Sequence, residues 1–149
     1  MRPTVLVFLV AAASAHADVS VDARPRSPLG PACDAALAAA QARFRDGQPA
    51  IDFHVHERRV VGEYHWSDMC GVWGDYTIEL APDHRAPLAW QWSSRTSGEP
   101  DSFHRRGTRR LNGWRARFLI DGDSDGYPGD AFVDAFRPAV DICLASASE

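Results

Sequence analysis

The chain has 149 residues, of which 45% are hydrophobic, enough for a single domain with one core. Its formal net charge is −4, and arginine supplies all 16 basic side chains because the sequence contains no lysine. The composition therefore excludes a lysine nucleophile or Schiff base, and the net acidity argues against a nucleic-acid binder, which needs a basic face.

The first residues have the pattern of a secretory signal peptide. A positively charged start precedes an apolar run from Val5 to Ala13, and an Ala-His-Ala site ends at Ala17. We therefore expect residues 1–17 to be removed and the product to be exported to the periplasm or the extracellular space. The apolar run is too short to cross a bilayer and no later stretch is long enough, so no membrane span is predicted. Residues 18–31 read as a flexible lead-in, and residues 32–149 as one domain.

The alternation of apolar and polar residues predicts a helix at each end of the domain and about six strands between them. Residues 32–45 form the first expected helix, whose apolar stripe should face the sheet and contains Cys33, Leu37, Ala40 and Phe44. Residues 131–146 form the last, with a kink or a break at Pro138. Turns are expected at Glu57-Arg58 and at Asn112-Gly113, a dipeptide that favours a type I′ hairpin. The segment from Arg95 to Asp101 is expected to form the longest loop, and the last strand to run from Trp114 to Ile120. The predicted fold is α+β, an antiparallel sheet with the N-terminal and C-terminal helices packed on one face. In element order this plan resembles small α+β rolls.

Three cysteines lie in the predicted domain. In an oxidising compartment they imply one disulfide and one remaining thiol. Cys33 and Cys143 each sit on the apolar stripe of a terminal helix, which favours this pair, and Cys33 with Cys70 is the alternative. No C-x-x-C spacing occurs, so zinc binding and thioredoxin-like redox chemistry have little support.

Histidines and carboxylates gather on the polar side of the first two predicted strands. His54 and His56 are two residues apart and point the same way, and Glu63 or His65 on the next strand could complete a metal or acid–base site. A small hydrolase or metal-dependent enzyme would follow from that arrangement. An ordinary polar outer face is the favoured alternative, because nothing in the pattern orients these groups uniquely.

The predicted hairpin around Asn112-Gly113 is dense in arginine. Its outward positions are Arg106, Arg110, Arg115 and Arg117. If Leu111 pairs with Trp114, Arg110 faces Arg115 and Thr108 faces Arg117. Like charges directly opposite cost about 0.2–1 kcal/mol. Water and the domain's own carboxylates could neutralise them, or an acidic protein, a phosphate or an anionic glycan could bind there. Trp73 also falls on the polar side of its predicted strand. It could serve as a stacking platform for a ligand, or it could pack under a neighbouring loop.

An acidic segment between the last strand and the last helix resembles the start of an EF-hand-type calcium loop. The matching ligand positions are Asp121, Asp123, Asp125 and the carbonyl of Tyr127. Pro128 departs from the pattern, and Phe132 stands where such loops have a bidentate glutamate, so Asp130 or Asp134 would have to supply a late carboxylate. The alternative is a solvated acidic turn in which Asp130 caps the helix.

Three hypotheses follow for the function. The first is a small exported, non-catalytic binding or inhibitor-like module that uses the arginine-rich hairpin and is braced by calcium. The second is the enzyme built on His54, His56, Glu63 and His65. The third is a structural, envelope-associated domain.

Overall fold

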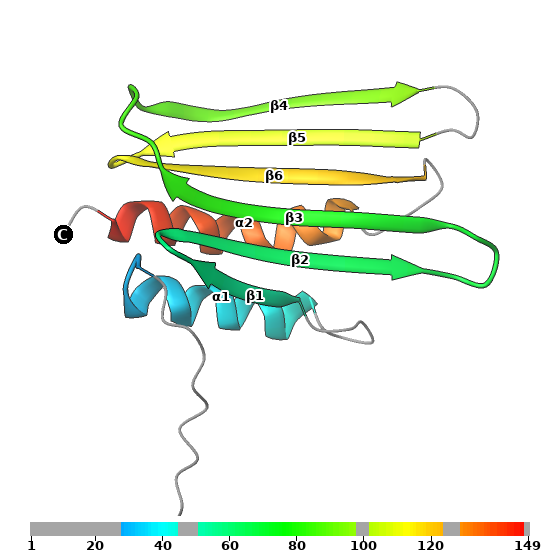
Figure 1. The fold of residues 1–149 in the computed structure, drawn as a ribbon, viewed down its shortest axis with the longest axis horizontal. Helices are drawn as coiled ribbons and strands as arrows, with labels where there is room; N and C mark the ends of the chain where they lie inside the picture. Colours follow the sequence, from blue (N-terminus) through cyan, green and yellow to red (C-terminus); the bar gives the residue numbers. More distant parts are fainter. Residues whose placement is uncertain (1–27, 45–50, 98–101, 124–128, 148–149) are drawn as a thin grey trace, which may run out of the picture.

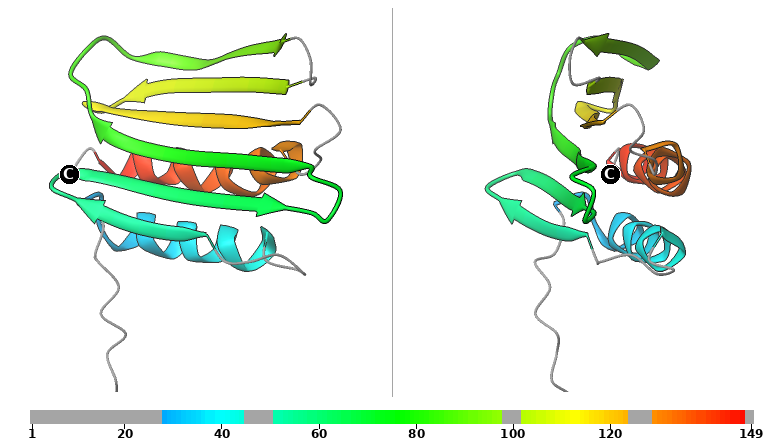
Figure 2. Two further views of the ribbon diagram at one scale, coloured as in Figure 1. Left: turned by 45° about the vertical axis from the view of Figure 1, so that its right-hand side comes forward. Right: turned by 90° about the vertical axis from the view of Figure 1, so that its right-hand side faces the viewer.

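The computed structural model describes residues 28–44, 51–97, 102–123 and 129–147. Six antiparallel strands form one sheet in the order β1-β2-β3-β6-β5-β4, and two helices lie side by side on one of its faces (Figures 1 and 2). The predicted α+β fold, with both terminal helices on the same face, is therefore confirmed. The predicted signal peptide and most of the lead-in fall outside the described residues.

The sequence patterns place the elements close to where they were expected. The helices are α1 (Pro31–Phe44) and α2 (Gly129–Ser146). The strands are β1 (Asp52–His56), β2 (Arg59–Ser67), β3 (Trp73–Pro82), β4 (Leu88–Ser97), β5 (Ser102–Leu111) and β6 (Trp114–Asp123).

The sheet consists of two antiparallel meanders. One contains β1, β2 and β3, the other contains β4, β5 and β6, and they join where β3 pairs with β6. The chain passes from β3 at the centre to β4 at the far edge through residues 83–87. The strands β3 and β6, which are far apart in the sequence, thus pair at the middle of the sheet, and β1 and β4 are its edges (Figure 1).

Both predicted turns are present. Asn112 and Gly113 have φ angles of 53° and 78°, the positive values that a type I′ turn requires at both central positions. Asn112 also donates a hydrogen bond from Nδ2 to the carbonyl of Leu144, at 3.0 Å, which ties the turn to α2. Glu57, in the turn before β2, has a φ of 54°. These turns set the register of their hairpins, and so decide which side chains share a face.

The core lies between the sheet and the two helices. Tyr76, Ile78 and Leu80 of β3 alternate with polar neighbours and are at most 2% exposed. Phe118 of β6 and Phe132 of α2 are fully buried against them. Burying a side chain of this size contributes about 1.5–3 kcal/mol, so this layer holds the sheet to the helices.

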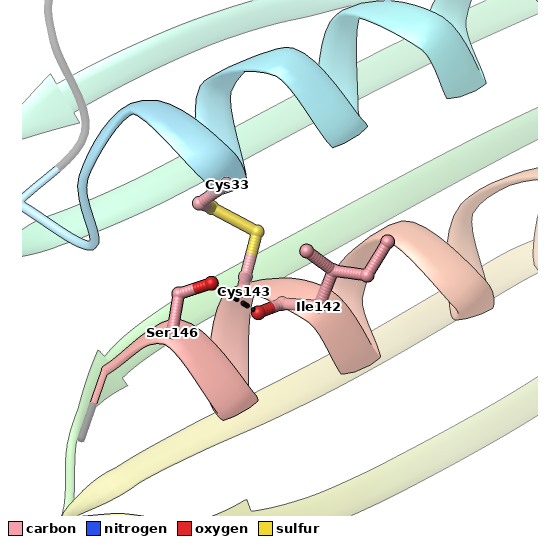
Figure 3. Close-up of a disulfide and its surroundings, with 4 residues drawn as sticks. All are labelled: Cys33, Ile142, Cys143 and Ser146. Carbon is pink, nitrogen blue, oxygen red and sulfur yellow. Dashed lines mark hydrogen bonds between the residues drawn. A yellow bond between two sulfur atoms is a disulfide. The ribbon is translucent and has the colours of Figure 1, made fainter.

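A disulfide between Cys33 and Cys143 links α1 to α2 (Figure 3). Both cysteines are completely buried, and 110 positions separate them in the sequence. Beside them, Ser146 donates from Oγ to the carbonyl of Ile142 at 2.7 Å (Figure 3). The favoured pairing is confirmed, and the alternative of Cys33 with Cys70 is wrong because Cys70 is a free, exposed thiol.

Three boundaries differ from the prediction. The last strand was expected to end at Ile120, but β6 continues to Asp123 because it pairs with β3 on one side and β5 on the other. Arg95 was assigned to a loop, but β4 runs on to Ser97 along β5. Of the two alternatives at Pro138, the break is wrong: α2 is continuous there, because the buried neighbours Phe136 and Val140 hold both halves against the core.

Candidate functional site

The face of the sheet that the helices leave uncovered, here called the open face, carries most of the predicted site residues. They occupy the strand positions that alternate with the core residues. These residues are His54, His56, Glu63, His65, Trp73, Arg106, Arg110, Arg115 and Arg117.

The predicted histidine cluster is spread along the edge formed by β1 and β2. His54 lies opposite Val61 and His56 opposite Arg59, while Glu63 lies opposite Asp52. His65 lies beyond the end of β1, and its cross-strand neighbour is Asp75 on β3. Among the described residues, no group of three or more histidine, cysteine or acidic side chains is arranged to hold a metal ion. The assignment of these residues to a catalytic role stays a prediction.

A different histidine arrangement crosses the sheet. Five open-face positions are successive cross-strand partners from β2 to β4: His65, Asp75, Asp121, His104 and Arg95. In this row His104 Nδ1 and Asp121 Oδ1 are 2.6 Å apart, and His65 Nδ1 contacts Asp75 Oδ1 in the same way. Each aspartate therefore has an imidazole beside it, which offsets the repulsion between two carboxylates on adjacent central strands.

The two His–Asp pairs differ in their exposure to solvent. The side chains of His104 and Asp121 are 35% and 34% exposed, whereas those of His65 and Asp75 are 66% and 55% exposed. Water competes less for a hydrogen bond as the bond becomes more buried. The His104–Asp121 pair is therefore the better held of the two.

Part of the arginine-rich hairpin is neutralised within the molecule. Arg115 donates from Nη2 to Glu79 Oε1 at 2.9 Å, and its Nη1 lies 3.6 Å from Asp83 Oδ2. Hydrogen bonds from Arg85, together with the charge of Arg115, hold the pKa of Asp83 well below its usual range. Arg110 lies opposite Arg115, as predicted, and donates from Nε to the carbonyl of Ala86 at 3.0 Å.

Three other arginines of the open face have no ion-pair or hydrogen-bond partner in the described part of the chain. Arg95, Arg106 and Arg117 are all exposed, and they lie on the adjacent strands β4, β5 and β6. The directly opposite residues are His104 for Arg95, and Ser93 and Leu119 for Arg106, and none of these is a carboxylate. Arg117 lies between Thr108 and Glu79, but Glu79 forms its ion pairs with Arg115 and Arg59. The positive charge at Arg95 and Arg106 thus has no carboxylate opposite it in the described sheet.

Two of these arginines line a shallow depression of about 540 Å³. Its lining residues, which define the arginine depression, are Ser93, Ser94, Arg95, His104 and Arg106. The guanidinium groups and the hydroxyl of Ser93 supply hydrogen-bond donors, and no acidic side chain belongs to the lining. Such a surface can hold a carboxylate, sulfate or phosphate group.

Arginines on the helix-covered side of β5 contrast with this set. Arg105 forms an ion pair with Asp130 of α2, and its guanidinium lies 4.6 Å from the centre of the Trp92 ring. Arg109 forms an ion pair with Asp141, which also accepts a hydrogen bond from Trp90 Nε1 at 2.8 Å. These arginines join the sheet to α2.

The residues of the predicted calcium loop are divided between the two sides of the sheet. Asp121 contacts His104, and Asp123 accepts a 3.2 Å hydrogen bond from the backbone nitrogen of Trp73. Asp130 is bound to Arg105 on the helix side. Asp125 and Tyr127 fall outside the described residues, so calcium binding by this segment stays a prediction. A rise in melting temperature with millimolar calcium would support it, and an unchanged melting temperature would contradict it.

Comparisons with known proteins identify no relative. No protein-family model matches the chain, and no curated protein or solved structure matches it. The chemistry of the open face is therefore the basis for assigning a function.

The sequence patterns missed three residues of this site. Arg95 was assigned to a loop, and His104 and Ser93 were not considered as site residues. The alternation of β5 places His104 on the same side as Arg106, which was a usable signal. The pairing of β4 with β5 is what brings Arg95 and Ser93 beside them.

Proposed function

We propose that this protein is an exported binding module that holds an acidic ligand in the arginine depression of its open face. The single observation that carries the proposal is the set of exposed arginines without partners, Arg95, Arg106 and Arg117, two of which line the depression. A carboxylate, sulfate or phosphate group placed there would accept charge-assisted hydrogen bonds, which are stronger than neutral ones.

The distribution of charge supports an anion as the ligand. The whole chain is acidic, with a formal net charge of −4, so the uncompensated arginines form a local basic area on an otherwise acidic protein. A surface area with charges of one sign attracts ligands of the opposite charge and speeds their association. Arg115 is neutralised by Glu79 and Arg110 is bound to a backbone carbonyl, whereas Arg95 and Arg106 have no such contact in the described part of the chain.

The disulfide supports export. The Cys33–Cys143 disulfide is buried between the helices, and disulfides persist in oxidising compartments outside the cytosol. No helix in the described ranges is long and apolar enough to cross a membrane. The partner expected in such a compartment is an acidic protein or an anionic glycan.

Affinity chromatography on immobilised heparin, a sulfated glycan, tests the proposal. Arg106→Glu replaces a donor of the depression with a repelling charge, so we expect elution at a clearly lower salt concentration than for the wild type. Arg43→Glu is the matched control, because it makes the same charge change on α1, behind the sheet. The proposal is wrong if both variants elute together, since net charge alone would then explain retention.

A further inference from the structure

We infer that a nucleophilic serine, Ser102, lies beside the arginine depression, in contact with its lining residue His104, and that the protein hydrolyses carboxylic esters that bear an anionic group. The inference rests on the proposed function only for the anionic group. The bond-breaking chemistry depends on three other side chains: Ser102, His104 and Asp121.

These three side chains form a continuous line of contacts. Asp121 Oδ1 lies 2.6 Å from His104 Nδ1, and the other ring nitrogen of His104, Nε2, lies 3.4 Å from Ser102 Oγ. A carboxylate, an imidazole and a hydroxyl in this order are the parts of a serine nucleophile with its general base. The longer contact is typical of a nucleophile and base without a substrate, and it tightens when one binds.

The sheet fixes this arrangement through its alternation and register. Ser102 and His104 are two residues apart on β5, so their side chains leave the same face. Asp121 is the direct cross-strand partner of His104 on β6, and Arg95 is its partner on β4. The imidazole is thus held between strands on both sides, and its Nδ1 is directed at the carboxylate.

The other His–Asp pair on the open face serves as an internal comparison. His65 contacts Asp75 across β2 and β3, and Ser67 lies two residues from His65 on the same strand. No hydrogen bond joins Ser67 to His65 in the described part of the chain, and the side chains of this pair are more exposed than those of His104 and Asp121. Only the pair on β5 and β6 therefore combines a hydroxyl with the imidazole.

The reaction follows from the positions of the three groups. Ser102 Oγ attacks the carbonyl carbon while its proton moves to His104 Nε2, and Asp121 stabilises the imidazolium at Nδ1. The intermediate collapses to an acyl-serine, and the leaving alcohol takes the proton from His104. Water then attacks the acyl-serine, giving its proton to His104, and the carboxylic acid leaves as the proton returns to Ser102.

Two arginines complete the site. Arg95 lies across from His104, where its guanidinium can donate to the oxyanion that forms during attack. Arg106 lies two residues from His104 on the same face, where it can bind a carboxylate, phosphate or sulfate elsewhere in the substrate. The expected substrates are therefore small esters whose acid part carries an anion.

Covalent labelling of the full chain with a fluorophosphonate tests the nucleophile. Mass spectrometry should find the phosphonyl group on Ser102 of the wild type, and Ser102→Ala should remove the labelling. Ser67→Ala is the matched control, and it should be labelled as fully as the wild type. The inference is overturned if the wild type is not labelled, or if Ser102→Ala is labelled equally.

Hydrolysis of 4-nitrophenyl acetate and of mono-4-nitrophenyl succinate tests the other roles. His104→Ala should lower kcat/KM by at least about 100-fold. Asp121→Asn should lower kcat and leave KM unchanged, because Asp121 orients the imidazole without touching the substrate. Arg106→Glu should remove the preference for the succinate ester. A loss of heat stability alone, with unchanged kinetics in folded protein, would contradict these roles.

Heparin binding by Ser102→Ala separates the two proposals. If Ser102→Ala binds heparin like the wild type and the wild type is not labelled, the inference is wrong and the proposed function stands. If the wild type is labelled but Arg106→Glu binds heparin like the wild type, the catalytic inference stands and the proposed function is wrong.

Discussion

Tyr76 is a buried phenol that the fold keeps protonated. Burial raises its pKa to about 12, although the hydrogen bond from Trp66 Nε1 to its hydroxyl, 2.9 Å long, acts in the opposite direction. A raised pKa in the folded state stabilises the fold below the ordinary value of 10.0, and that contribution is lost as the pH rises towards about 12. The protein should therefore lose stability across this alkaline range.

Tyr76→Phe tests this residue. The variant should be less stable at neutral pH by about 0.5–1.5 kcal/mol, because Trp66 loses its acceptor. Its stability should then fall less steeply than that of the wild type above pH 10, since it has no phenol to ionise at this position. Urea unfolding at a series of pH values measures both effects. Parallel curves for the two proteins would show that Tyr76 does not control the alkaline response.

Glu79 is the principal partner of Arg115 on the open face. The two side chains are only 19% and 15% exposed, so a neutral residue at position 79 would leave a half-buried guanidinium without its main counter-charge. We expect Glu79→Gln to lower the free energy of unfolding by about 1–3 kcal/mol. Glu63→Gln, at an exposed position of the same face, should change it by less than about 0.5 kcal/mol. Equal effects in urea unfolding would contradict this role.

At the scale of single elements, the local patterns in the sequence were sufficient to predict the hairpins. Asn112-Gly113 defined the turn, and the alternation from Trp114 onward placed Arg110 opposite Arg115 and Thr108 opposite Arg117, as the structure confirms. The turn and the alternation each depend only on residues that are close together in the sequence. The same information identified the stripe of α1 that packs against the core, which contains Cys33, Leu37, Ala40 and Phe44.

The candidate site could not be predicted in the same way, because it depends on strand neighbours that are distant in sequence. The pairing of β3 with β6 extends β6 through Asp121 and Asp123, which the local pattern assigned to a loop. The extension brings Asp121 opposite His104. Arg95 likewise joins the site only because β4 continues beside β5. No local periodicity in the sequence contains these pairings.

Gly107 lets β5 accommodate the large indole ring of Trp92 on β4. A Cβ atom at position 107 would lie 2.4 Å from the ring, which Phe118 and Arg105 hold on other sides. Gly107→Ala should displace the ring and lower the free energy of unfolding by about 1–3 kcal/mol. Near-ultraviolet circular dichroism should show the change in the Trp92 environment, with Thr108→Ala on the open face as the control. An unchanged spectrum and stability would contradict this packing.

At the scale of the whole molecule, the Cys33–Cys143 disulfide closes a loop of 110 positions between the two helices. A cross-link of this span restricts the unfolded chain strongly, so replacing both cysteines by alanine should cost about 2–5 kcal/mol. Cys70→Ser, at the exposed free thiol, should leave the stability within about 0.5 kcal/mol of the wild type. Urea unfolding of the three proteins compares them. A double variant as stable as the wild type would show that the disulfide is dispensable.

The molecule divides its charged side chains between two roles. On the helix side, Arg105 and Arg109 are bound to acidic residues of α2 and hold the layers together. On the open face, Arg95 and Arg106 line a depression without a counter-charge. This division gives the proposed function its physical basis, because the arginines that join the sheet to α2 are different from those that line the depression.

Nuclear magnetic resonance titration of the full protein with sodium sulfate tests that proposal most directly, with sodium chloride at equal ionic strength as the reference. We predict saturable shifts of the Arg95 and Arg106 side-chain Nε–H signals and of the His104 backbone amide, and no saturable shift for Arg43 on α1. Arg106→Glu should abolish the saturation. Shifts that are absent, identical in chloride, or centred away from β4 and β5 would contradict anion binding at the arginine depression.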